Sequence, residues 1–243
     1  MRSLLAFFTI LPVRSSSLRQ AARSVHLLPL IGLVTGLPGA AVVLLAYFLP
    51  GGVAATLALT AVLIAAGFHH SDGVLDVGDA LMVRGSRQRR REVLKDSRVG
   101  IGGIGALFAV YAPALTALGA LTDASPVRAA LALVAGEVAA RSAMLLVLSF
   151  GKPAEKTSSS VAFVQDLSGT RKSAGILLAL AAPFLLTLPL GGFAFLSALV
   201  VPLVVLLALR AANAAFGGIG GDVTGATGEL ARTALLVALS ATI

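Results

Sequence analysis

The residues best suited to chemistry are acids gathered in one short stretch of a chain that has few of them. Five of the eleven acidic residues lie between positions 72 and 96: Asp72, Asp76, Asp79, Glu92 and Asp96. If this segment is helical, Asp72, Asp76 and Asp79 stand at i, i+4 and i+7 and share one face. Carboxylates on one face repel each other unless cations neutralise them, and Mg²⁺ prefers such oxygen ligands together with substrate phosphates. The spacing predicts a metal site, and the alternative is a solvated loop whose acids balance nearby arginines.

A basic segment follows the acids and ends in a group of mixed charge, Lys95-Asp96-Ser97-Arg98. Asp96 is a candidate for a further metal ligand, and Arg98 is a candidate for a bidentate phosphate contact. For the arginine run at 89–91 we expect contact with anionic lipid headgroups.

Two later segments add candidates for substrate binding. Glu137 and Arg141 stand four apart in an apolar stretch, which predicts either an ion pair within one helix or an Arg141 that faces a substrate cavity. Residues 216–229 are rich in glycine and contain Gly221 and Asp222. We expect a loop there whose backbone N–H groups contact phosphate, although it is not a P-loop because no Gly-Lys-Ser/Thr follows.

The composition indicates which elements position these residues. Of 243 residues, 57% are apolar and 12% are charged, about half the ~25% charged residues of soluble domains. That favours an all-α, polytopic integral membrane helical bundle, built as a single domain over residues 1–243. Stretches long enough to cross ~30 Å of hydrocarbon predict spans at 27–49, 52–68, 101–122, 127–149, 173–190, 193–210 and 229–243. The last is short, so six or seven transmembrane helices are expected.

The cations predict the orientation. Fifteen of the nineteen Lys and Arg residues lie in three segments, at 2–23, 84–98 and 152–172, which alternate spans would place on one side. The positive-inside rule assigns that side to the cytoplasm. The net charge of +8 therefore indicates anionic lipid as a partner and not nucleic acid. The chain has no cysteine, which excludes disulfides, Cys-ligated zinc and a thiol nucleophile.

The acidic pattern resembles a known family, the cobalamin synthases or adenosylcobinamide-GDP ribazoletransferases. The resemblance rests on His70-x-Asp72-Gly73-x-x-Asp76-x-x-Asp79-Ala80-Leu81 and on Lys95-Asp96-Ser97-Arg98-x-Gly100. Three further segments agree in order: Phe8-Thr9-Ile10-Leu11-Pro12-Val13, Pro29-Leu30-Ile31-Gly32-Leu33-Val34-x-Gly36, and Gly217-Gly218-Ile219-x-Gly221-Asp222-Val223. Ser71 and Val77-Gly78 depart from the family pattern, but no acid of the pattern is missing.

The resemblance implies a Mg²⁺-dependent enzyme of the cell inner membrane, and the grouping of the cations predicts that its active site is on the cytoplasmic side. Its reaction is the last assembly step of cobalamin biosynthesis, in which α-ribazole or its 5′-phosphate joins adenosylcobinamide-GDP and GMP leaves. On this interpretation Asp72, Asp76, Asp79 and Asp96 bind metal, and His70 acts as a base or orients the nucleophile. Arg98, Arg141, Gly221 and Asp222 are then candidate substrate contacts.

Two other classes remain open at this point. A CDP-alcohol phosphatidyltransferase-like enzyme also uses spaced aspartates in a membrane helix, but its Asp-Gly-x-x-Ala-Arg pattern is missing here. A cation transporter uses clustered acids as well, more often at the bilayer midplane. The sequence leaves open the phosphorylation state of the acceptor, the number of metal ions and whether the chain forms a homo-oligomer.

Overall fold

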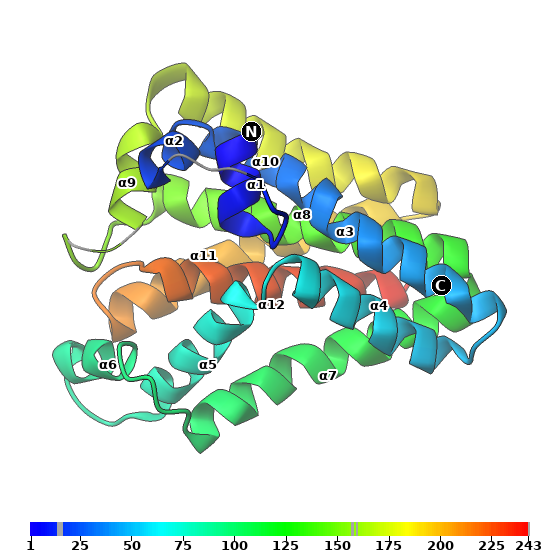
Figure 1. The fold of residues 1–243 in the computed structure, drawn as a ribbon, viewed down its shortest axis with the longest axis horizontal. Helices are drawn as coiled ribbons and strands as arrows, with labels where there is room; N and C mark the ends of the chain where they lie inside the picture. Colours follow the sequence, from blue (N-terminus) through cyan, green and yellow to red (C-terminus); the bar gives the residue numbers. More distant parts are fainter. Residues whose placement is uncertain (14–16, 157, 159, 243) are drawn as a thin grey trace.

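Helix α8 (Pro126–Phe150) is the centre of the fold, because it is buried along most of its length. The computed structural model describes residues 1–13, 17–156, 158 and 160–242, and these form helices without a named strand. Five long helices pack directly on α8: α3 (Leu28–Val43), α7 (Ile101–Ala124), α10 (Gly169–Thr187), α11 (Val200–Ala215) and α12 (Gly221–Ser240). They run mostly along the long axis of the molecule (Figure 1). The predicted all-α bundle is confirmed.

Small residues allow the central helices to approach closely. A Cβ added at Gly32 of α3 would lie 2.6 Å from the carbonyl oxygen of Glu137 on α8. One at Gly36, a turn further along, would lie 3.0 Å from the Cα of Val134. Glycines four apart therefore form the contact face of α3, as is common where helices associate in lipid.

Five helical stretches are long and apolar enough to cross a membrane: Val25–Tyr47, Ile101–Ala124, Pro126–Phe150, Gly169–Leu190 and Ala194–Ala215. The first, fourth and fifth include short 3₁₀ turns, η1 (Val25–Leu27), η2 (Leu44–Tyr47), η3 (Leu188–Leu190) and η4 (Ala194–Leu199). The expected span at 229–243 is part of the longer α12, which is not among the five. Helix α12 carries the charged residues Asp222, Glu229 and Arg232, so it is less apolar than these five.

The expected second span, 52–68, is two helices and not one. Helix α4 (Gly51–Ala65) ends, and α5 (His69–Met82) leaves at 95° to it, so that the pair counts at most as one broken sixth span. The end of α4 explains the bend. Gly67 has a φ of 69°, Phe68 N–H donates to Leu63 O at 3.0 Å, and Gly67 N–H donates to Ile64 O at 2.8 Å. This is a Schellman motif, which ends a helix through a left-handed glycine.

The segments rich in cations lie toward one end of the bundle. Two of them, at 84–98 and 152–156, meet in space, where Lys95 donates to Glu155. Both also bond to the loop after α11, through Arg91 to Phe216 O and through Ala154 N–H to Ile219 O, and they lie on the left in Figure 1. The short helices α2 (Leu18–Arg23), α6 (Arg87–Val93) and α9 (Ser160–Asp166) are at this end, and α1 (Arg2–Phe8) packs on α2. Arg14, one of the counted cations, lies outside the described residues. The predicted grouping of the basic segments is therefore present.

Candidate active site

Helix α5 carries the three spaced aspartates at the basic end of the bundle. Asp72, Asp76 and Asp79 all lie within His69–Met82, which confirms that they share one helix. Asp72 is exposed, whereas Asp76 and Asp79 are half-buried. The bend before α5 turns this helix away from the direction of α4 and lays it between α7 and α12 (Figure 1).

Asp222 joins these acids from a distant part of the sequence. A Cβ added at Gly73 would lie 2.7 Å from the carbonyl oxygen of Asp222, so α5 and the start of α12 touch at backbone distance. The negative charges of Asp72, Asp222 and Asp79 all act on Asp76. The structure therefore brings together Asp72, Asp76 and Asp222, which we call the acid cluster.

The glycine-rich segment is shorter as a loop than the sequence predicts. The expected loop over 216–229 is wrong beyond position 220, because Gly221 and Asp222 form the first turn of α12. The remaining loop, residues 216–220, is bonded to the segment after α8. Ile219 N–H donates to Lys152 O at 2.8 Å, and Ala154 N–H donates to Ile219 O at 2.9 Å. Later glycines serve packing: a Cβ at Gly225 would lie 3.1 Å from the His70 ring.

Asp79 differs from the other acids because backbone groups already engage both of its oxygens. Gly100 N–H donates to Oδ2 at 2.7 Å and Gly103 N–H donates to Oδ1 at 2.8 Å. A carboxylate at the start of α7 accepts N–H groups that have no partner within the helix and complements the helix dipole. Asp79 therefore positions α7 against α5, and its predicted metal role stays a prediction.

Asp96 and Arg98 form a pair of their own at a separate, open hollow of about 480 Å³ that Asp79 also lines. Arg98 Nη2 donates to Asp96 Oδ2 at 2.7 Å, and Arg98 Nε donates to Oδ1 at 3.0 Å. These bonds lower the pKa of the Asp96 carboxyl to about 2. The structure thus shows Arg98 bound to Asp96, and the predicted metal and phosphate roles of the two residues stay predictions.

No group of three histidines and acids among the described residues is placed to hold a metal ion as it stands. The donor chemistry nevertheless suits a hard cation, since the charge of Asp72 acts on both Asp76 and Asp222, and Asp72 is exposed while the other two are half-buried. Carboxylate oxygens with open positions for water and phosphate are the usual surroundings of Mg²⁺ in proteins.

A second set of charges is buried inside the bundle. Glu137 and Arg141 of α8 and Glu229 and Arg232 of α12 are each at most 1% exposed; we call these four residues the core network. Arg232 Nη1 donates to Glu137 Oε1 at 2.9 Å, Arg232 also pairs with Glu229, and Arg141 Nη2 lies 3.5 Å from Glu137 Oε2. The sequence predicted two alternatives for Glu137 and Arg141, and the first, an ion pair within one helix, is present in α8. A phosphate contact by Arg141 stays a prediction.

Glu229, Arg232 and Tyr111 were not among the residues predicted from the sequence. Tyr111 OH donates to Glu229 Oε2 at 2.8 Å and lies 2.7 Å from Ser71 Oγ, so α7 links the core network to α5. An acid and a base three apart inside an apolar segment, as at 229 and 232, are a usable signal, because charges in a membrane helix face the protein interior and pair there.

His70 connects the core network to a cavity. Arg141 Nη1 lies 2.9 Å from His70 Nδ1, and a guanidinium only donates, so Nδ1 accepts and the ring carries its proton on Nε2. The ring stacks on Phe8 with centroids 6.1 Å apart. It lines an apolar cavity of about 450 Å³ whose wall also includes Phe163 and Asp222.

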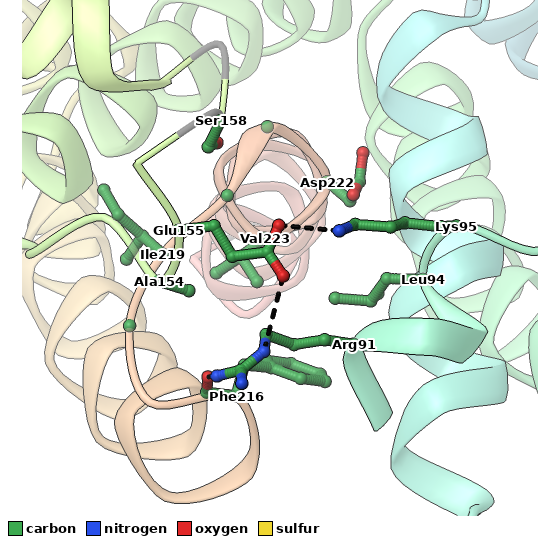
Figure 2. Close-up of a pocket in the computed structure, with 13 residues that line it drawn as sticks. Arg91, Leu94, Lys95, Ala154, Glu155, Ser158, Phe216, Ile219, Asp222 and Val223 are labelled. Atoms are coloured by element: carbon green, nitrogen blue, oxygen red, sulfur yellow. Dashed lines mark hydrogen bonds and ion pairs between the residues drawn. The ribbon is translucent and has the colours of Figure 1, made fainter. Parts of the chain in front are cut away.

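A second, more polar cavity lies on the other side of Asp222. It measures about 220 Å³ and is lined by Arg91 of α6 and the segment after it, by Ala154, Glu155 and Ser158, and by Phe216 and residues 218–223. Figure 2 shows Glu155 between two cations, with Lys95 Nζ donating to Oε2 at 2.7 Å and Arg91 Nε 3.5 Å from Oε1. These two cations lower the pKa of the Glu155 carboxyl, chiefly through the hydrogen bond from Lys95. Gly221 and Asp222 belong to both cavities.

The arginine run at 89–91 bonds inside the protein as well. Arg91 Nη1 donates to Phe216 O at 2.9 Å, Arg90 Nε donates to Val83 O at 3.1 Å, and Arg89 pairs with Glu92 at 3.0 Å. Arg91 thereby satisfies a carbonyl just past the end of α11, a group that has no partner within the helix. The expected lipid contact of this run stays a prediction.

Comparison with known proteins supports one family. The family model described as cobalamin-5-phosphate synthase matches residues 1–240. An adenosylcobinamide-GDP ribazoletransferase of Azorhizobium caulinodans is 34% identical over 242 residues, which cover 96% of this chain and 92% of that protein. A protein of the same name from Halorubrum lacusprofundi is 38% identical over 252 residues, covering 97% and 94%. No solved structure matches the chain.

Proposed function

Since the chain belongs to the cobalamin-5-phosphate synthase family, we propose that the acid cluster and the two cavities beside it are the site of the family's reaction. The chain catalyses the last assembly step of cobalamin. Its substrates are adenosylcobinamide-GDP and α-ribazole or the 5′-phosphate of α-ribazole. The observation that supports the site assignment is that Asp222, which lines both cavities, lies against α5 at backbone distance from Gly73, beside Asp72 and Asp76.

The reaction exchanges one bond to phosphorus for another. A ribose hydroxyl oxygen of α-ribazole bonds to the phosphorus attached to cobinamide and loses its proton. The bond from that phosphorus to the bridging oxygen breaks, and the oxygen leaves with GMP. Two substrates must therefore meet end to end, and two cavities that share Gly221 and Asp222 supply that arrangement.

The acid cluster is the proposed Mg²⁺ site. Asp72, Asp76 and Asp222 supply carboxylate oxygens without a paired cation among the contacts of the described residues. When bound there, Mg²⁺ would neutralise negative charge on the phosphate oxygens. Asp79 and Asp96 are not among the proposed metal ligands. Asp79 accepts a hydrogen bond from Gly100 at the start of α7, and Asp96 accepts one from Arg98.

His70 is proposed to orient the ribose hydroxyl as a hydrogen-bond donor. Its Nδ1 faces the guanidinium of Arg141, which leaves Nε2–H as the polar group of a ring that lines the apolar cavity. Of the two roles that the family resemblance implies for His70, this geometry supports orientation of the nucleophile and not the role of a base.

The decisive assay uses purified full-length protein with adenosylcobinamide-GDP, α-ribazole and Mg²⁺, and follows the release of GMP. We expect GMP only when both substrates and the metal are present. Binding of Mn²⁺, followed by its paramagnetic resonance signal, gives a readout that does not depend on turnover. Ion flux in proteoliposomes without release of GMP would instead favour a transporter.

We further propose that the basic end of the bundle faces the cytoplasm at the inner membrane. The cations at 84–98 and 152–172 support this orientation by the positive-inside rule. Because the native chain has no cysteine, a single introduced cysteine is its one thiol, and its labelling shows on which side of the membrane that position lies. An impermeant thiol reagent added to intact cells should label Phe48→Cys, at the opposite end, and should leave Ser86→Cys unlabelled. The reverse pattern would overturn the orientation.

A further inference from the structure

The polar cavity beside Asp222 has the lining of a phosphate site. Arg91 and Lys95 bring positive charge from one segment, and the backbone of Gly218, Gly220 and Gly221 forms another part of the wall. The Lys95 side chain is 65% exposed, so an anion can reach it from solvent. The neighbouring cavity is lined instead by Phe7, Phe8, Phe163 and other apolar side chains, which suit an aromatic base and not a phosphate.

An acid already stands where the phosphate would bind. Glu155 is 29% exposed and lies between Lys95 and Arg91, within 2.7 Å and 3.5 Å of their nitrogens. Figure 2 shows this carboxylate inside the cavity, on the segment that faces α6. A carboxylate and a phosphate accept hydrogen bonds from the same cationic donors, so Glu155 competes for the donors that an incoming phosphate needs.

We propose that this cavity binds the guanosine phosphate portion of the nucleotide-bearing substrate, and that Glu155 is an internal anion which the phosphate displaces from Lys95 and Arg91. This assignment rests on the proposed function for the identity of the nucleotide. It gives roles to Lys95, Arg91 and Glu155 that the acid cluster does not need. It also explains how the two cations remain paired in the absence of substrate and become available to it.

Displacement predicts opposite effects for the two partners of the bridge. Glu155→Gln removes the competing charge and should tighten binding of GMP by about threefold to tenfold, the size of one partly exposed charge contact. Lys95→Gln removes a donor and should weaken GMP binding by about the same factor. A merely structural bridge predicts that both variants weaken binding alike, because both break it.

The experiment is equilibrium dialysis of GMP against the purified full-length protein in a neutral detergent. Guanosine, inorganic phosphate and phosphatidylglycerol serve as competitors, and elution volume confirms folding. Arg84→Gln is the matched control, since Arg84 is an exposed cation of the same segment that does not line the cavity. We expect Arg84→Gln to bind GMP like the wild type and guanosine to compete at least about tenfold less well than GMP.

Several outcomes decide the matter. Tighter binding in Glu155→Gln with weaker binding in Lys95→Gln supports the proposal. Weaker binding in both variants, or no change in either, overturns it. Displacement of GMP by phosphatidylglycerol at lower concentration than by inorganic phosphate also overturns it, in favour of a lipid headgroup.

Kinetics separate this inference from the proposed function. If wild-type protein releases GMP from the two substrates, but Glu155→Gln does not lower the KM for adenosylcobinamide-GDP, the inference fails and the function stands. If GMP binds with the expected pattern but no GMP is released from the two substrates, the function fails and the phosphate cavity stands.

Discussion

The acid cluster and the core network are both groups of charged side chains on α-helices, but they are balanced differently. The core network contains two acids and two arginines, all at most 1% exposed, and its members pair with one another. The acid cluster contains three acids near one another, of which Asp72 is exposed. Balanced charge in the interior joins helices, because each buried ion needs a partner. Unpaired negative charges at the end of the bundle repel one another, so a bound cation from solution would stabilise them.

The largest effect is expected in the core network. Glu137→Ala leaves Arg141 and Arg232 with a single acid, Glu229, and we expect a loss of about 3–5 kcal/mol in stability. Unfolding in detergent, followed by circular dichroism, measures it. The control Glu92→Gln removes an exposed partner of Arg89 and should change little. A Glu137→Ala protein as stable as the wild type would show that the core network does not stabilise the packing of the helices.

A large loss of activity without a loss of stability is expected in the acid cluster. Asp72→Asn and Asp76→Asn should each lower kcat by at least about 100-fold, the usual range for loss of a key electrostatic contact. Their melting temperatures should stay the same or rise, because each change relieves repulsion between like charges. Mn²⁺ binding should weaken in parallel. Near-normal turnover of both variants at saturating Mg²⁺ would contradict the metal assignment.

Asp79 tests where the acid cluster ends. Because its oxygens accept from Gly100 and Gly103, Asp79→Asn should lower stability by about 1 kcal/mol, as for loss of a helix cap. Its Mn²⁺ affinity should fall less than that of Asp72→Asn. An equal fall in both would extend the metal ligands to Asp79, as the spacing in the sequence predicts.

The smallest effect concerns pH and the Glu155 bridge. The pKa of the Glu155 carboxyl is lowered in the folded protein, chiefly by Lys95. The bridge therefore stabilises fully above the ordinary glutamate pKa and is lost as the pH falls through the lowered value. The difference in melting temperature between wild type and Glu155→Gln should be constant from about pH 6 to 8 and should shrink only below about pH 4. A difference that changes near pH 7 would point to another titrating group.

Much of the fold and part of the site follow from local patterns in the sequence. The apolar stretches predict the long helices, and the 3.6-residue period places Asp72, Asp76 and Asp79 on one helix. The bend at Gly67 was not predicted, because glycine ends a helix only where its left-handed φ is used, and apolar residues continue to position 68. The helical start at Gly221 was missed for a related reason, since glycine-rich segments have low intrinsic helix propensity and α12 forms through packing.

By itself, the sequence determined that this protein is a helical membrane bundle with its cations at one end, a row of spaced acids among them, and a resemblance to one enzyme family. Hydrophobic length, charge and helical period are properties of neighbouring residues, so they can be read along the chain. Only the tertiary structure decided that Asp222 joins Asp72 and Asp76, and that Glu155 lies between Arg91 and Lys95. In both groups, residues about 60 to 150 positions apart in the sequence lie close together. They depend on close helix contacts such as that of Gly73 with Asp222, where the lack of a side chain, and not any local propensity, sets the distance.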